Sequence, residues 1–95
     1  MARCPYPPLI QTLIFSKKLF TEDSVERWLR ANGFDPRASF IRETSQSYRA
    51  IQYPKEEFVP DSFRTHRLGG PRGKVQAVVG CPFASLQARR RHPHR

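Results

Sequence analysis

Few residues of this chain could carry out chemistry, and the first candidate is a histidine. His66 lies in FRTHRL, between Thr65 and Arg67, and is the one histidine in the part of the sequence that we expect to fold. General base catalysis needs an acid or a nucleophile beside the histidine, and the sequence identifies none. We therefore interpret His66 as an exposed strand residue, and we expect no catalytic residues, no cofactor and no enzymatic activity.

A glycine-rich segment, GGPRGK at 69–74, could instead bind a phosphate. Backbone N–H groups of a glycine turn, together with Arg72 and Lys74, can hold such an anion. The spacing is too short for a P-loop, and no Ser or Thr follows the lysine. A hairpin loop that uses glycine for its backbone geometry is the simpler interpretation.

Arginines and polar residues gather around a predicted hairpin. Arg42 and Arg49 are placed to face each other across its two strands, with Glu43 as a neutralising partner. Such a group can be an ordinary solvated set of cross-strand charges, or it can grip a partner. In the second case we expect a protein partner to contact Arg42, Tyr48, Arg49, Gln52, Arg64 and Arg67.

The alternative function is nucleic-acid binding by the same face and the basic C-terminal tail. The strands place aromatic residues beside arginines, as in proteins that bind single strands. However, no RRM signature, KH loop or zinc finger is present, and aromatic residues in so small a domain are more often core. Salt-dependent phosphate contacts would come from Arg72, Lys74, Arg89, Arg90 and Arg91.

Composition and charge limit the class of protein. The 95 residues fit one domain with a thin core, and 38% hydrophobic residues are too many for full disorder. The net charge is +9; Arg3 and the four arginines at 89, 90, 91 and 95 carry five of these charges, which leaves +4 for the folded part. A basic balance favours polyanions or acidic protein surfaces as partners.

The local pattern predicts an α+β domain over residues 9–82, with an extended lead-in over 1–8 and a disordered basic tail over 83–95. The clearest element is a helix with Thr21 as its N-cap, an apolar stripe through Val25, Trp28 and Leu29, and Gly33 just past its end. Strands are expected at 9–15, 39–44, 48–53, 63–68 and 75–80. This β-α-β-β-β-β order predicts a small, mostly antiparallel sheet with the helix packed on one face.

Two cysteines, Cys4 and Cys81, lie just outside the first and last predicted strands. Without a CxxC motif they do not make a zinc site, and we expect no metal. The thiols could meet if those strands are neighbours, whereas an intracellular location favours free thiols; the sequence leaves their pairing open. Apolar runs are too short to span a membrane and the start is a poor signal peptide, so we expect a cytoplasmic protein without a membrane partner.

The order of motifs over residues 9–82 resembles a small module of bacteriophage and prophage genomes, which stands alone or is joined to head-maturation proteases. The resemblance rests on W-L-x-x-x-G-F at 28–34, E-T-x-x-x-Y-R-x-x-Q-x-P at 43–54, F-R-T at 63–65 and V-Q-A-V-V-G at 75–80. It implies a viral or prophage origin and a host-cytoplasmic location, and no protease catalytic residues match. We therefore expect a non-enzymatic binding module that docks a protein partner through its basic hairpin face.

Overall fold

The helix α1 (Glu22–Ala31) forms where its capping residues predict it. The Thr21 hydroxyl accepts a hydrogen bond from the Ser24 N–H (3.2 Å), and the Ser24 hydroxyl accepts one from the Thr21 N–H (2.8 Å). This reciprocal pair is a capping box. Past the other end, Gly33 has a φ of +79°, and the Phe34 N–H donates to the Leu29 carbonyl at 2.9 Å. The computed structural model describes residues 4–68 and 74–91.

Five strands form one antiparallel sheet in the order β2-β3-β1-β5-β4. They are β1 (Leu9–Ser16), β2 (Ile41–Glu43), β3 (Ser47–Ile51), β4 (Arg64–Arg67) and β5 (Val75–Gly80). The predicted α+β class is thus confirmed. The predicted strand at 39–44 is shorter than expected, because a 3₁₀ turn, Ala38–Phe40, occupies its beginning.

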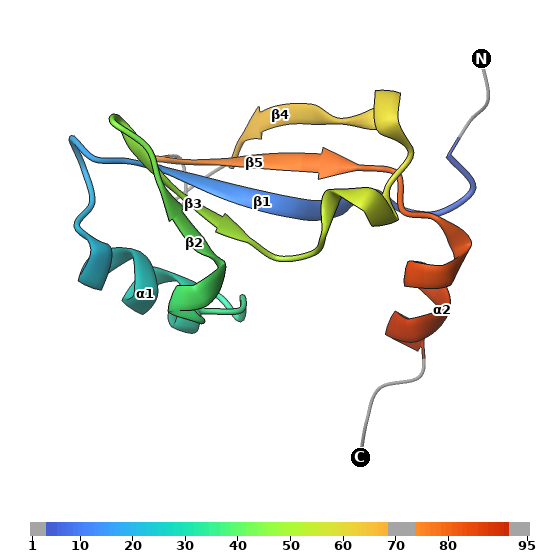
Figure 1. Ribbon diagram of the computed structural model, residues 1–95, viewed down its shortest axis with the longest axis horizontal. Coiled ribbons are helices and arrows are strands. Elements are labelled where there is room, and N and C mark those ends of the chain that lie inside the picture. The colour runs from blue at the N-terminus through green and yellow to red at the C-terminus, as the bar shows by residue number, and fades with distance from the viewer. Residues whose placement is uncertain (1–3, 69–73, 92–95) are drawn as a thin grey trace.

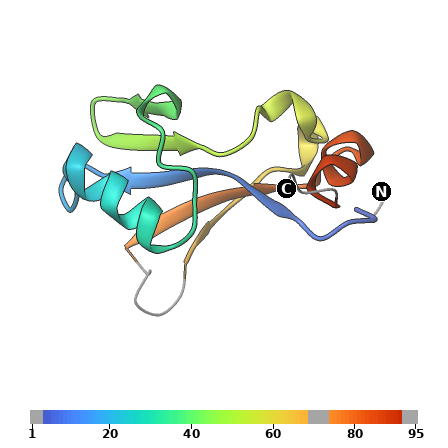
Figure 2. The same cartoon turned by 90° about the horizontal axis from the view of Figure 1, so that it is seen from below.

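One face of the sheet is covered by α1, as Figure 2 shows from below. Side chains alternate between the two faces of a strand, so one set of residues from β1, β3 and β5 points at the helix. The Trp28 ring packs edge-on against Phe15, with 5.2 Å between the ring centroids, and stacks on Phe34, with 5.8 Å between the centroids. The buried cluster consists of Leu13, Phe15, Val25, Leu29, Ala50, Val75 and Ala77.

A second packed region closes the far end of the sheet, between the predicted strands at 48–53 and 63–68. Two 3₁₀ turns, Lys55–Glu57 and Pro60–Ser62, flank the fully buried Phe58. The Phe58 and Phe63 rings, 5.6 Å apart, lie against Gly80. A Cβ at this glycine would come within 2.9 Å of both rings, so the close approach requires a residue without a side chain.

The chain after β5 forms the helix α2 (Ala84–Arg91), which corrects the prediction of a disordered tail from residue 83. Leu86 is 1% exposed, and the Phe83 N–H donates to the Glu57 carbonyl at 2.9 Å. These are tertiary contacts, and the sequence has no apolar periodicity that would reveal them. Residues 92–95 lie outside the described residues.

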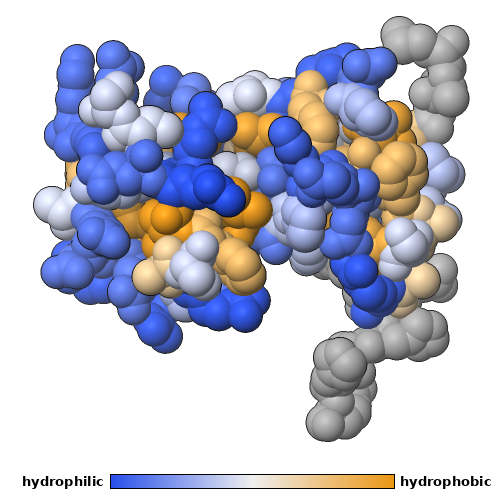
Figure 3. Space-filling view, viewed as in Figure 1, coloured by the Kyte–Doolittle hydropathy of each residue, from blue (hydrophilic) through white to orange (hydrophobic). Residues whose placement is uncertain are grey.

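The two helices lie at opposite ends of the molecule in both ribbon views (Figures 1 and 2). The hydrophobic residues on the face seen in Figure 3 likewise form two groups, one toward α1 and one toward α2, with hydrophilic residues over much of the surface between them. The strands therefore connect two separately packed ends.

A disulfide joins Cys4 to Cys81, with the two Cα atoms 5.7 Å apart. The argument from an intracellular location favoured free thiols and is wrong here. The other argument, strand proximity, decides the outcome: Leu9 pairs with Gly80 in the register of β1 and β5, which brings the flanking cysteines together. The disulfide fixes the lead-in to the end of β5.

Replacing Trp28 by Ala should lower the free energy of unfolding by about 3 kcal/mol, because the ring packs on two core aromatics but is only half-buried. Chemical denaturation measures the change. Arg27→Ala, an exposed position on the same helix, is the control and should change stability by less than about 0.5 kcal/mol. Equal effects of the two substitutions would contradict the packing of α1 on the sheet.

Replacing Cys4 by Ser should cost about 2–4 kcal/mol, since the cross-link restrains a sequence separation of 77 residues in the unfolded chain. Thermal unfolding with and without reductant gives the measurement. Cys81→Ser should show a similar loss, and adding Cys4→Ser to it should remove little more, because one bond is lost in every case. Additive losses would argue against the pairing.

Candidate functional site

The face of the sheet opposite α1 carries a register row that crosses all five strands. Starting at β2, each residue pairs with the next: Arg42 with Arg49, Arg49 with Ile14, Ile14 with Gln76, and Gln76 with Arg67. Their neighbours along the strands, such as Leu13 and Ala50, are in the core under α1. We call the face that carries Arg42, Arg49, Ile14, Gln76 and Arg67 the open face.

Three of the predicted partner-binding residues, Arg42, Arg49 and Arg67, thus share one face, and all three are exposed. The register of β2 and β3 confirms the prediction that Arg42 and Arg49 lie opposite each other. The prediction that Glu43 neutralises them is wrong, because alternation turns Glu43 to the other face, where its carboxylate pairs with Lys17. Glu43 therefore does not neutralise the positive charge that Arg42 and Arg49 place on the open face.

Two other predicted residues point away from the open face. Tyr48 pairs with Phe15, packs against the core, and has the Lys17 ammonium 5.3 Å above its ring. Arg64 pairs with Val79, one position out of phase with the row, and its guanidinium donates to the Phe63 carbonyl at 2.8 Å. The strand period of two separates these side chains from their sequence neighbours.

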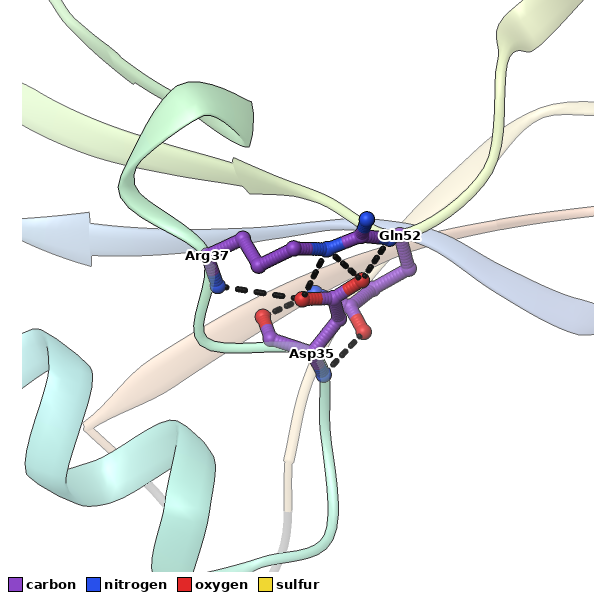
Figure 4. A network of polar contacts seen from close by, with 3 residues as sticks. All are labelled: Asp35, Arg37 and Gln52. Atoms are coloured by element: carbon purple, nitrogen blue, oxygen red, sulfur yellow. Dashed lines mark hydrogen bonds and ion pairs between the residues drawn. The ribbon is translucent and has the colours of Figure 1, made fainter.

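Gln52, the sixth predicted residue, uses its amide to hold the chain together (Figure 4). Its Oε1 accepts from the Asp35 N–H at 2.8 Å, and its Nε2 donates to the Asp35 carbonyl at 3.2 Å. This pair of bonds ties the loop after α1 to the end of β3. Gln52 therefore has a structural role at this junction, and its predicted contact with a partner stays a prediction.

The Asp35 side chain extends this network by fixing Arg37. The carboxylate accepts from the Arg37 backbone N–H (3.0 Å) and from Nε and a terminal nitrogen of the guanidinium (3.0 and 2.6 Å). These hydrogen bonds hold the pKa of Asp35 below its ordinary value of 3.8, against a smaller opposing effect of burial. The fixed guanidinium lies 4.4 Å over the Phe40 ring, which is 38% exposed.

Two hollows flank the arginine pair. The first, about 480 Å³, has Phe40, Ile51, Tyr53 and Pro54 among its lining residues, with the charged side chains Arg42, Lys55 and Glu56 also at its surface. We call it the apolar hollow. The second, about 730 Å³, lies at the other end of the open face, and Lys17, Lys18, Arg67 and Lys74 are among the residues that line it. We call it the basic hollow.

Lys74 and Arg89, the two predicted phosphate-binding residues whose side chains are described, lie apart in the structure. Lys74 lines the basic hollow, whereas Arg89 in α2 pairs with Glu57 at the far end of the sheet. Arg72 lies outside the described residues. Arg90 and Arg91 are in α2, and their side chains are outside the described part.

Other chemistry predicted from the sequence is placed as follows. His66 is exposed on β4, opposite Ala77, as expected of a surface strand residue. Within 4–68 and 74–91, no three or more His, Cys, Asp and Glu side chains gather where a metal ion could be held. In the same part of the chain, no helix has the length and apolar character needed to cross a membrane.

Sequence reasoning missed Lys17 and Lys18, which line the basic hollow. They follow the apolar part of β1 and look like ordinary turn residues. In this antiparallel sheet, the C-terminal end of β1 lies beside the start of β3 and the start of β5, so it is at the same end of the sheet as the β2–β3 turn and the β4–β5 connection. Knowledge of the strand order would have shown that these basic residues lie together, but the sequence alone did not give the strand order.

Asp35→Asn should flatten the acid side of the stability profile. Because the pKa of Asp35 is lowered in the folded state, its contribution is present above the ordinary value of 3.8 and is lost as pH falls below it. Denaturant unfolding at several pH values between about 2.5 and 6 would show a smaller loss in the variant. Asp61→Asn changes a carboxyl outside the network and serves as control. Parallel profiles for Asp35→Asn and the unsubstituted protein would contradict the role of this carboxylate.

Comparisons of the chain with protein-family models, with curated proteins and with solved structures found no match. The resemblance to phage modules therefore stays a prediction from the sequence, and the geometry of the open face carries the functional argument.

Proposed function

We propose that this chain is a non-enzymatic binding module that docks an acidic protein surface through its open face. The observation that carries the proposal is the exposed Arg42–Arg49 pair, whose charge is not neutralised by Glu43. Two arginines side by side attract carboxylates and give bidentate hydrogen bonds to them. A viral or prophage origin is part of this proposal and is supported by the sequence motifs alone.

The apolar hollow favours a protein over a nucleic acid as the partner. Protein interfaces place arginine and aromatic residues around buried anchors from the other chain. Here Arg42 borders a hollow with Phe40, Ile51 and Tyr53 in its lining. The Arg37 guanidinium is fixed over Phe40 and supports that side of the hollow. An apolar side chain flanked by carboxylates would fill the hollow and meet the arginines together.

Nucleic acid is the competing proposal, and the positions of the aromatic rings count against one form of it. Binding of single strands depends on exposed rings that stack on the bases. Phe15 is buried and Tyr48 packs against the core, although both are strand residues. Phe40, which is 38% exposed, and Tyr53 in the apolar hollow could still stack on a base. The other contacts would be to phosphates, and their affinity would fall steeply with salt.

The test is selection from a displayed library of random peptides on the immobilised full chain. We expect enrichment of peptides with Asp or Glu around one aliphatic or aromatic residue. Arg42→Ala combined with Arg49→Ala should weaken the enriched peptides at least about tenfold, as expected for loss of close charged contacts. Arg27→Ala, which removes an arginine from the exposed side of α1, should leave the affinity within about twofold.

The same variants separate the two partner classes. An oligonucleotide that binds at low salt, combined with no enrichment of acidic peptides, would replace the protein proposal by the nucleic-acid one. Enriched peptides that bind the arginine variants as well as the unsubstituted chain would place docking elsewhere. Peptide affinity that depends on Phe40→Ala as well as on the arginines would support use of the apolar hollow.

A further inference from the structure

The basic hollow lies where three segments of the chain converge. Ser16 ends β1 and Lys17 to Leu19 follow it, residues 45 and 46 lie in the β2–β3 turn with Ser47 at the start of β3, and Arg67 ends β4 while Lys74 precedes β5. The turn is pinned to β1, because the Lys17 N–H donates to the Gln46 carbonyl at 2.9 Å. The Thr44 hydroxyl accepts from the Ser47 N–H at 3.0 Å and closes the turn. The Lys17–Gln46 hydrogen bond thus holds the turn against the end of β1, while the pairing of β1 with β5 and of β5 with β4 brings Lys74 and Arg67 to the same end of the sheet.

The lining of this hollow has the chemistry of an anion site. The residues that line it include Lys17, Lys18, Arg67 and Lys74, and no Asp or Glu is among the described residues that line it. The Lys17 ammonium is paired with Glu43 and lies over the Tyr48 ring on the α1 side of the sheet, so the anion site depends on Lys18, Arg67 and Lys74. Lys18 and Lys74 are exposed. Further hydrogen-bond donors to an anion would be the hydroxyls and amides of Ser16, Ser45, Ser47, Gln46 and Gln76.

The number and kind of donors favour a phosphoryl group over a single carboxylate. A carboxylate has one negative charge and two oxygens, whereas a phosphoryl group has more charge and three oxygens that accept strong hydrogen bonds. Point charges from lysines with flexible stems, joined by hydroxyl groups, suit such oxygens. Ile14 contributes an apolar surface within the same hollow.

We propose that the basic hollow is a binding site for a phosphoryl anion with two or more negative charges. The site is distinct from the protein-docking pair, since Arg42 and Arg49 do not line it. It therefore does not depend on the proposed function, and the two can be tested in the same variants. The phosphoryl group could belong to a free polyphosphate compound or to a nucleic-acid backbone, and the experiment distinguishes these sources.

The experiment follows backbone amide resonances of the full chain during titration with inorganic triphosphate at about 0.1 M salt, where long-range attraction is screened. We expect saturable shifts of Lys17, Gln46, Ser47 and Gln76. Lys18→Ala combined with Lys74→Ala should weaken binding at least about tenfold through loss of two charged contacts. Both lysines are exposed, so the variant should fold, which thermal unfolding checks.

Two control variants separate this site from the rest of the molecule. Arg27→Ala, and Arg42→Ala combined with Arg49→Ala, should bind triphosphate within about twofold of the unsubstituted chain. Shifts that do not saturate, that lie only in α2 and the residues after it, or that persist in the lysine variant would overturn the proposal. Failure of the unsubstituted chain to bind acidic peptides, with triphosphate binding intact, would remove the proposed function and leave this site standing.

A second titration, with duplex and single-stranded oligonucleotides at matched phosphate concentration, identifies the source. Tighter binding of either oligonucleotide through the same amides and the same lysines assigns the phosphoryl group to a nucleic-acid backbone. Triphosphate binding without oligonucleotide binding assigns it to a small phosphorylated compound. If neither ligand shifts the amide resonances of the hollow, the proposed site is refuted.

Discussion

The pairing of β1 with β3 on one side and β5 on the other is the constraint on which the structure depends. Leu13 and Phe15 of β1 are fully buried under α1, so Ile14 between them must face the other way. A slip of one residue would exchange the two faces and expose both core side chains. Because β1 is central, its register also fixes which residues of the outer strands reach the open face. The chemistry of that face is therefore set by the packing on the opposite one.

Local signals were sufficient to predict the helix and the class of fold. The cap at Thr21, the apolar stripe and Gly33 each act within a few residues. The facing of Arg42 and Arg49 followed from the short turn between two strands. These predictions succeeded because the interactions that decide them lie close together in the sequence.

The remaining features depend on contacts between distant segments. Gln52 looks like any polar strand residue until Asp35, 17 positions earlier, meets its amide. The helix α2 has no amphipathic pattern, and its position rests on Leu86 and on bonds to residues near Phe58. Cys4 and Cys81 pair because β1 and β5 are neighbours, which chain order alone does not establish. The basic hollow was missed for the same reason.

Like charges that stand directly opposite each other weaken a pair of strands. The Arg42–Arg49 pair lies between β3 and β2, and β2 is a three-residue edge strand with little other pairing to offset the repulsion. The free protein thus contains a locally frustrated edge, which a bound carboxylate would relieve. Occupancy and the order of β2 are then thermodynamically linked, so each strengthens the other. If the proposed docking holds, a substitution that removes this repulsion would make the isolated domain more stable and weaken its binding of the partner.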